Sequence, residues 1–329
     1  MSARSAEERG AYIVERLLGS QGHVSGEDLA ERLGVSRTAV WNCVSGLKRL
    51  GLQIESQPHL GYRLAAEPDI LLPAVVRHGL AAAVIGRRVV HLESASSTSD
   101  EAERLAREGE AEGTVVIAEG QTAGRGRMGR AWRSPRGKGI YLSIILRPAL
   151  VPSRASFLTL CGAVAAQRAI SACAPGVRAS LKWPNDVMIG GRKVCGILTE
   201  LTTEADRINH AVVGVGINAN HAASHLHGVP GATSLRIETG SAVSRPALAR
   251  GFLEAFDENY SLLAAGRRAE IVERWLAASE TVGRRVRVAS FQGECWEGVA
   301  TGLDDDGCLL VRLDTGMTRR ATGGDVALL

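Results

Sequence analysis

The sequence lacks several features that would assign its class at once. Its longest apolar runs, such as residues 80–86, are far shorter than the ~20 residues that a membrane-spanning helix needs. The first ten residues lack the apolar core of a signal peptide. The six cysteines include no Cys-x-x-Cys pair, so we expect reduced thiols instead of a disulfide framework. These absences favour a cytoplasmic protein without a membrane partner.

A strong overall charge is also missing. The formal net charge of +4 is too small to bind nucleic acid by overall electrostatics, so any basic surface must be local. The composition, 45% hydrophobic and 22% charged, is that of an ordinary globular protein, and 329 residues allow two or three domains. We find no internal repeat and no low-complexity tract.

Residues 1–65 predict helices followed by a short β element. Ile13 and Leu17 lie on one face of a first helix, Ser25 is a candidate N-cap of a second, and Gly34 ends it. A third helix begins after Ser36, and the alternating residues 52–64 indicate a hairpin that turns near residues 59–61. This pattern predicts a winged helix-turn-helix domain.

The third helix has an apolar face and a polar, basic one. Val40, Val44 and Leu47 share the inward face, which leaves the opposite face free to enter the major groove of DNA. A three-helix interaction module that does not bind DNA is the alternative. The predicted DNA-contacting residues are Ser36, Arg37, Thr38, Trp41, Ser45, Lys48 and Arg63.

Residues 66–278 mix strands and helices. Apolar, β-branched runs at 113–121 and 138–146 predict buried strands, 156–172 a buried helix, and 246–278 two amphipathic helices. Because strands come in runs with helices grouped beside them, we predict an α+β domain instead of an alternating Rossmann fold. Residues 279–329 contain short strands separated by turn sequences, which is typical of a small β barrel.

Residues 120–135, "GQTAGRGRMGRAWRSP", form a segment that we call the arginine loop. It holds four arginines, four glycines and no acid. Glycines let backbone N–H groups approach an anion, and guanidinium groups bind carboxylate or phosphate oxygens in pairs. The loop predicts a cradle for a polyanion; a solvated basic loop or an RNA-contacting segment is the alternative. It is not a P-loop, and its match to Gly-x-Gly-x-x-Gly precedes a strand instead of a helix.

A second cluster follows in "KWPND" (182–186) and "GGRKVCG" (190–196). Asn185 and Asp186 offer oxygen ligands that suit Mg²⁺ carried by nucleotide phosphates. Alternation along a strand predicts that Lys193, Cys195 and Ile197 share one face. A lone strand lysine would more often be a surface residue, but its neighbours favour a functional one.

These motifs, together with "VGVGIN" (213–218) and the N-terminal winged helix, resemble the bifunctional biotin–protein ligases that also repress the biotin operon. The resemblance covers nearly the whole chain, with the motifs in family order. It implies a class-II-synthetase-like mixed sheet for 66–278 and an SH3-like barrel for 279–329. It also implies ATP, Mg²⁺ and biotin as ligands, with a biotin carboxyl carrier protein domain and operator DNA as partners, and it leaves homodimer formation open.

The reaction that the resemblance implies has two steps. The biotin carboxylate attacks the α-phosphate of ATP to give biotinyl-5′-AMP, and a lysine of the carrier domain then takes the biotinyl group. Since two unit charges 4 Å apart repel by ~4 kcal/mol at an effective dielectric near 20, a cationic, glycine-lined loop suits this chemistry. The alternatives are an adenylate-sensing transcription regulator with little transfer activity and a lipoate-type acyl ligase.

The resemblance also assigns residues. Arg127 and Lys193 are the implied catalytic residues, and Asp186 the residue nearest the Mg²⁺. The implied biotin-binding residues are Ser97, Thr98, Ser99, Gln121, Arg125, Gly126, Arg127 and Lys193. The implied ATP-binding residues are Gly124, Arg125, Arg127, Trp132, Lys182, Asn185, Asp186 and Asn218. The family usually has Asn where Ser99 stands. By residue type alone, Ser97 and Thr98 could equally cap a helix, and Trp132 could be a packing lid.

The segment after Asn218 departs from the family pattern. It is shorter than in the best-known regulators, so we expect adenylate-driven ordering and dimerisation to differ. Its His221, His225 and His227 have a spacing seen in zinc sites, but the sequence shows no fourth ligand. Cys195 is interpreted as a small buried residue.

Overall fold

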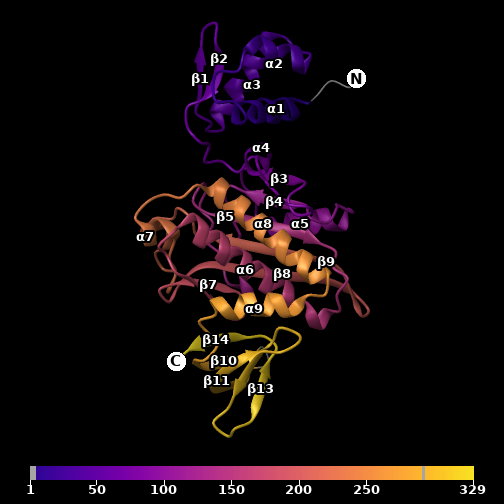
Figure 1. Cartoon of the computed structure of the whole chain (residues 1–329), viewed down its shortest axis with the longest axis vertical. Helices are drawn as coiled ribbons and strands as arrows, with labels where there is room; N and C mark the ends of the chain where they lie inside the picture. The colour runs from indigo at the N-terminus through magenta and orange to yellow at the C-terminus, as the bar shows by residue number, and fades with distance from the viewer. Residues whose placement is uncertain (1–4, 291–292) are drawn as a thin grey trace. The chain divides into compact units, whose positions relative to one another are not determined.

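The computed structural model describes residues 5–290 and 293–329. The chain forms two compact units, one up to Leu80 and the other from Ala81 onward. Figure 1 shows the elements of both units, labelled in chain order.

The first unit contains the predicted helices and hairpin. Its elements are α1 (Ala6–Leu18), α2 (Gly26–Leu33), α3 (Arg37–Arg49), β1 (Ile54–Gln57), β2 (Gly61–Leu64) and α4 (Pro73–Arg77). Ser25 caps α2 by accepting hydrogen bonds from the backbone N–H groups of residues 27 and 28, and Gly34 ends the helix in the left-handed conformation, with φ 65°. The prediction of an N-terminal helix-turn-helix domain is confirmed.

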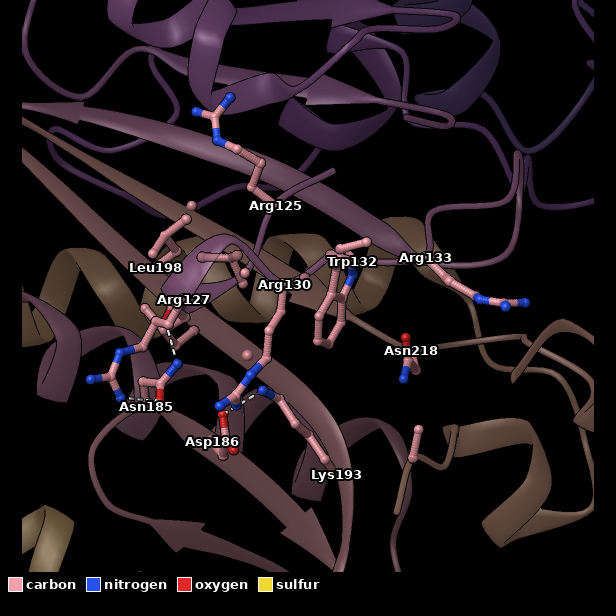
Figure 2. Close-up of a pocket in the computed structure, with 18 of the residues that line it drawn as sticks. Arg125, Arg127, Arg130, Trp132, Arg133, Asn185, Asp186, Lys193, Leu198 and Asn218 are labelled. Atoms are coloured by element: carbon pink, nitrogen blue, oxygen red, sulfur yellow. Dashed lines mark hydrogen bonds and ion pairs between the residues drawn. The ribbon is translucent and has the colours of Figure 1, made fainter. Parts of the chain in front are cut away.

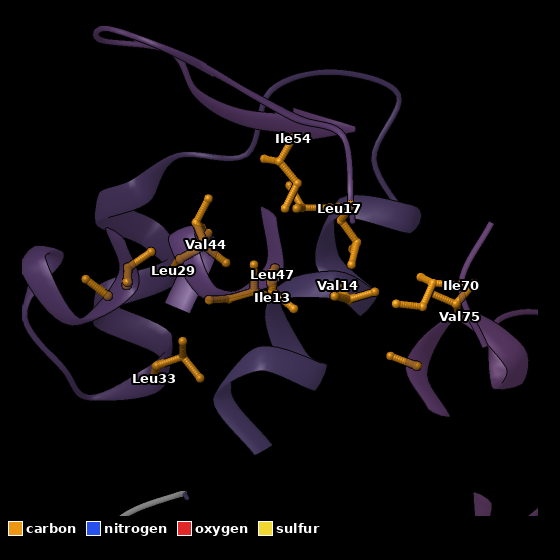
Figure 3. Packing of buried hydrophobic residues seen from close by; sticks show 14 residues of the cluster. Ile13, Val14, Leu17, Leu29, Leu33, Val44, Leu47, Ile54, Ile70 and Val75 are labelled. Atoms are coloured by element: carbon orange, nitrogen blue, oxygen red, sulfur yellow. The ribbon is translucent and has the colours of Figure 1, made fainter. Parts of the chain in front are cut away.

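The core of this unit gathers residues from all its elements (Figure 3). Ile13 and Leu17 of α1 pack with Val44 of α3, and the cluster extends to Ile70 and Val75. The segment that follows the hairpin therefore belongs to the same compact unit. The hairpin turn itself requires a glycine, because a Cβ at Gly61 (φ +108°) would lie 2.1 Å from the carbonyl oxygen of Val24.

The second unit is built on a seven-stranded mixed sheet. The strands are β3 (Val89–Leu92), β4 (Val115–Ala118), β5 (Ile140–Leu146), β6 (Ala179–Lys182), β7 (Asp186–Ile189), β8 (Arg192–Glu204) and β9 (Arg207–Ile217). Their order is β3-β4-β5-β9-β8-β7-β6, with β3 and β4 parallel and every other pair antiparallel. The predicted α+β mixed sheet is confirmed; β3 had no counterpart among the predicted strands.

Helices cover both faces of this sheet. The helices are α5 (Thr98–Arg107), α6 (Ser156–Cys173), α7 (Leu235–Thr239), α8 (Arg245–Ala264) and α9 (Arg268–Ala278). On one face α5 packs through Ala102 onto Val116 and Ile145. On the other face Gly162 of α6 lies against Ile197, and α8 and α9 pack on α6 (Figure 1). The face covered by α5 carries the site described below.

The segment Pro152–Cys173, which contains α6, is the one described helical stretch that is long and apolar enough to cross a membrane by length and composition. Its 18-residue window is 61% buried inside the protein. Packing of α6 between the sheet and α8 accounts for this apolar composition as that of a core helix.

The C-terminal residues form the predicted small β domain. Its strands are β10 (Arg285–Ala289), β11 (Cys295–Leu303), β12 (Leu309–Arg312), β13 (Thr318–Ala321) and β14 (Asp325–Leu328), in the order β13-β12-β11-β10-β14 with every pair antiparallel. Trp183 joins this barrel to the sheet, because its backbone N–H donates to Thr281 Oγ1 (3.0 Å) and its indole N–H to the carbonyl of Gly307 (3.3 Å).

Asp257 of α8 holds the start of the second unit. Its carboxylate accepts hydrogen bonds from the backbone N–H groups of residues 83, 84 and 85 at 2.8, 2.9 and 2.9 Å. Since Asp257→Ala removes the acceptor of all three, we expect the unfolding free energy of this unit to fall by about 3 kcal/mol in urea denaturation. Asp206→Ala, in the exposed turn between β8 and β9, is the control. Equal stability of the two variants would contradict this account of Asp257.

Candidate active site

A cavity of about 520 Å³ lies over the α5-covered face of β8 and β9, within the size range of small-molecule sites. Of the predicted ligand-binding residues, it is lined by Ser97, Thr98, Ser99, Gln121, Arg125, Gly126, Arg127, Trp132, Lys182, Asn185, Asp186, Lys193 and Asn218. Gly124 lies behind the wall, where a Cβ would come within 2.8 Å of Gln121 Nε2. Residues from distant parts of the sequence are thus gathered in one place.

The floor of the cavity is made of glycines: Gly196, which the sequence indicated as leaving room on one strand face, and Gly214 and Gly216, which it did not single out. Gly196 of β8 pairs with Gly216 of β9, and Gly214 follows on the same face. A Cβ at Gly216 would lie 2.4 Å from the ring of Trp132, and one at Gly214 would lie 2.8 Å from Ser99 Oγ. The missing side chains therefore make room at the floor for the Trp132 ring and the Ser99 hydroxyl, which line the cavity. The alternation Gly214-x-Gly216 is the pattern that could have revealed it.

One end of the cavity is lined by neutral hydrogen-bonding groups. Thr98 donates its backbone N–H and its hydroxyl to Gln121 Oε1 (2.8 and 3.2 Å), and Gln121 Nε2 donates to Ser134 Oγ (2.8 Å). The hydroxyls of Thr98 and Ser99 lie 2.9 and 3.1 Å from Ser143 Oγ. We call the set Ser97, Thr98, Ser99, Gln121 and Ser143 the hydroxyl end.

Sequence reasoning placed Ser97 in this site with helix capping as a compatible role, and it did not single out Ser143. Ser97 is the N-cap of α5, so the capping role and the place in the cavity coexist. Ser143 was missed, although a lone serine within the apolar strand "IYLSIIL" was a usable indication. It is fully buried, and buried hydroxyls require partners.

The opposite end of the cavity is cationic (Figure 2). Arg127 donates to Asn185 Oδ1 and to the carbonyl of Gly324, both at 3.1 Å, and burial lowers the pKa of its guanidinium. The Lys193 ammonium lies 2.6 Å from Asp186 Oδ1 and 5.4 Å from the centre of the Trp132 ring. Two cations from separate elements therefore face one end of the cavity, which we call the cationic end.

The prediction that Lys193 and Cys195 lie on the same face of their strand is wrong. A β-bulge interrupts the pairing of β7 and β8, so that Met188 pairs with Lys193 but Val187 with Cys195. The extra residue, Val194, turns Lys193 toward the side of Gly196, where its Nζ is 3.1 Å from the position of a Cβ. Cys195 is fully buried, and burial raises the pKa of its thiol.

Two other arginines of the arginine loop form ion pairs with carboxylates. The guanidinium of Arg125 pairs with Asp100 of α5 and with Glu200 of β8, and the hydrogen bond that it donates to Asp100 raises its pKa. Arg130 pairs with Asp325 of β14. In Figure 2 the Arg125 and Arg133 side chains point away from the cationic end. Arg125 thus lines the cavity while its charge is neutralised by two carboxylates.

The remaining wall comes from the segment after β9 and from the barrel. Asn218 Nδ2 donates to the carbonyl of Thr233 (2.9 Å), which fixes the two ends of the intervening segment together. This segment lines the cavity with Leu226, Val229 and Pro230, and β14 contributes residues 325–327. The part played by β14 was not predicted, because nothing local in the sequence places the barrel next to the arginine loop.

The histidines of this segment have separate partners. His221 is buried, its Nε2 lies 3.1 Å from the hydroxyl of Tyr141, and burial lowers its pKa to about 4. His225 Nδ1 accepts a hydrogen bond from the backbone of Ala222 (2.9 Å). Within residues 5–290 and 293–329, no group of three or more His, Cys, Asp or Glu side chains could hold a metal ion.

The predicted DNA-contacting residues lie in the first unit. Arg37, Thr38 and Lys48 are exposed on α3, as is Trp41, with 59% of its surface accessible. Ser36 is the N-cap of α3, and Ser45 is partly buried. Lys48 donates to Ser56 of the hairpin (3.0 Å), and Arg63 pairs with Glu55 (2.7 Å). The exposed face of α3 is therefore polar and basic, with the charge of Arg63 balanced by Glu55.

Comparisons with known proteins agree with this arrangement. Residues 92–218 match the Biotin/lipoate A/B protein ligase family, residues 9–63 an HTH domain, and residues 281–329 the Biotin protein ligase C terminal domain. The chain is 36% identical to the bifunctional ligase/repressor BirA of Bacillus spizizenii over 90% of this chain and 91% of that protein. It is 34% identical to BirA of Escherichia coli over 92% of each chain.

A solved structure gives the same assignment. The biotin protein ligase from Aquifex aeolicus in complex with biotin and ATP superposes with a TM-score of 0.63 at 27% identity, covering 74% of this chain and 99% of that one. The chain therefore belongs to the biotin protein ligase family, with the domain composition of its bifunctional ligase/repressors.

Proposed function

We propose that the protein activates biotin with ATP to biotinyl-5′-AMP and transfers the biotinyl group to a lysine of a biotin carboxyl carrier protein domain. The observation that carries this proposal is the polarity of the cavity. Its hydroxyl end suits the neutral ureido ring of biotin, and its glycine floor suits an apolar chain. Its cationic end suits a carboxylate that lies beside phosphates.

The cationic end would carry the first step. A carboxylate oxygen of biotin attacks the α-phosphorus of ATP, and pyrophosphate leaves with the electron pair of the broken P–O bond. Arg127 and Lys193 offset the repulsion between these anions and stabilise the charge that develops on the phosphoryl oxygens. Asn185 and Asp186 hold these two side chains at the cavity, through contacts of 3.1 and 2.6 Å. Trp132, beside Lys193, offers a ring on which adenine would stack.

The residues present fit a magnesium ion that arrives with ATP. Asp186 and Asn185 place one carboxylate and one amide oxygen in the cavity, and Mg²⁺ is commonly bound by one or two carboxylates together with substrate phosphates. Such an ion would screen the charges of the triphosphate. Asp186 is the residue that would hold it.

Lys193→Ala tests the cationic end. We expect adenylate formation, measured as biotin-dependent pyrophosphate release, to slow by about 100-fold or more, because one donor to the developing charge is lost. The control is Arg136→Ala, which removes an exposed cation that follows the arginine loop, lies outside the cavity and pairs with Glu93. Unchanged release in Lys193→Ala would remove that residue from the reaction.

Gly216→Ala tests the glycine floor. Because its Cβ would meet the Trp132 ring at 2.4 Å, the ring must shift into the cavity, and we expect the KM for biotin to rise about tenfold or more. Gly302→Ala, where a Cβ meets nothing within 4 Å, is the control. If both variants keep the wild-type KM, the floor does not lie under the ligand.

We propose further that the first unit binds operator DNA and represses biotin genes in the cytoplasm when the second unit holds biotinyl-AMP, with homodimer formation as part of the switch. The exposed polar and basic face of α3 supports DNA binding, as do the relatives named ligase/repressor. The alternative of an adenylate sensor with little transfer activity has no support in the cavity, where Arg127 and Lys193 are both in place.

A lipoate-type acyl ligase is the remaining alternative, since the matched family model includes lipoate enzymes. The hydroxyl end favours biotin, because lipoic acid has no ureido group to exchange hydrogen bonds with Ser99 and Gln121. Competition between labelled biotin and an excess of lipoate for the cavity separates the two.

Arg37→Ala tests the DNA-binding face. We expect weaker binding to operator DNA and a slope of log K against log salt that is smaller by about 1, if Arg37 contacts a phosphate. Arg16→Ala, which removes an exposed charge from α1, serves as the matched control in a fluorescence-anisotropy titration. An effect of equal size in both variants would contradict a specific role of α3.

A further inference from the structure

A second cavity, of about 370 Å³, adjoins the active site and is here called the side chamber. It lies between the start of α6, the turn before β7, the middle of β8 and the barrel. Six residues line both cavities: Arg127, Trp183, Pro184, Asn185, Ile197 and Leu198. The side chamber therefore borders the cationic end of the active site, and Arg127 is accessible from both cavities.

The pairing of β7 and β8 explains why a chamber exists at this place. β7 begins at Asp186, opposite Gly196, so β8 continues beyond this point without β7 beside it. Asn185, just before β7, still bonds to β8: its carbonyl accepts a hydrogen bond from the N–H of Ile197 (2.9 Å), and its Nδ2 donates to the carbonyl of Ile197 (2.8 Å). Beyond Ile197 the space next to β8 is bounded by α6 and the barrel.

The two cavities differ in charge. The active-site cavity is lined by Lys182 and Arg133 and by the ion pairs of Arg130 with Asp325 and of Lys193 with Asp186, in addition to Arg127. In the side chamber Arg320 is neutralised by Asp304 and Asp306. An ammonium group that approaches Arg127 through the side chamber therefore meets less like charge than one that enters past the arginine loop.

The lining of the side chamber also suits a long amine side chain. Leu160, Ile197 and Leu198 offer apolar surface for methylene groups, and the hydroxyls of Thr159 and Thr199, 2.8 Å apart, offer hydrogen-bonding partners. We propose that the acceptor lysine of the carrier domain reaches the adenylate through this side chamber, an inference that rests on the proposed function. The barrel, which forms the outer wall, then takes part in carrier recognition.

The side chamber serves the second step of the reaction, in which the biotinyl group is transferred to the carrier lysine. The lysine, as the neutral amine, forms an N–C bond to the acyl carbon of biotinyl-AMP, and the acyl C–O bond to the phosphate breaks. AMP leaves with that electron pair, and the amine loses its proton to solvent. The product is an amide, and Arg127, which lines both cavities, lies beside the phosphate that departs.

Two substitutions at the rim of the chamber test the route. Ser153 and Thr322 are exposed residues of its lining, one before α6 and one in the barrel. Ser153→Trp and Thr322→Trp should slow single-turnover transfer from preformed, enzyme-bound biotinyl-AMP to a purified carrier domain at least tenfold. Pyrophosphate release without carrier should stay within twofold of wild type. Thr318→Trp, exposed on the same barrel and outside both cavities, is the control for bulk.

Wild-type transfer rates in both variants would overturn the route. Parallel loss of pyrophosphate release and transfer would overturn it as well, because the chamber would then act on the first step. A wild-type protein that releases no pyrophosphate with biotin and ATP would instead contradict the proposed function itself, so the two failures are distinguishable.

Discussion

The repulsion between a carboxylate and a triphosphate is the constraint on which the rest of the site depends. Both anions must come within bonding distance, and cations alone cannot achieve this if they are free to turn toward solvent. Here each cation is fixed by the fold: Arg127 by Asn185 and Gly324, and Lys193 by Asp186. The arginine loop is also held by two further ion pairs, Arg125 with Asp100 and Arg130 with Asp325. Under the proposed function the positive charge of the loop serves two purposes: Arg127 would meet the ligand, while Arg125 and Arg130 anchor the loop.

The floor of the cavity depends on glycines of the sheet, which have no side chains. Paired glycines on β8 and β9 remove side chains from the floor, and Trp132 lies directly over Gly216. The bulge at Val194 then aims Lys193 into the space that the glycines leave. β14 of the barrel completes the wall of the active-site cavity. The barrel also bounds the side chamber, which lies next to β8 where β7 begins. Neighbouring positions of β8 and β9 thus supply the floor of the cavity and the Lys193 ammonium, and β8 also borders the side chamber.

Much of this could be predicted from the sequence because the motifs are contiguous. The arginine loop, "KWPND" and the capped helices of the first unit each lie within one short segment, and local periodicity placed them on the correct elements. Features that depend on pairing between distant strands could not be read in this way. The bulge changed the face of Lys193, Ser143 joined the hydroxyl end through β5, and Asp325 reached the loop from the far end of the chain. β3 was also missed; it joins the sheet by parallel pairing with β4, which a local pattern does not reveal.

The central claim is that Arg127 and Lys193 jointly hold the biotin carboxylate against the α-phosphate. A crystal structure of the protein with a non-hydrolysable biotinyl-AMP analogue tests it most directly. The account predicts the phosphate and acyl oxygens within hydrogen-bonding distance of both side chains, with the ureido group among Thr98, Ser99 and Gln121. An analogue bound elsewhere, with Arg127 and Lys193 directed into solvent, would contradict it.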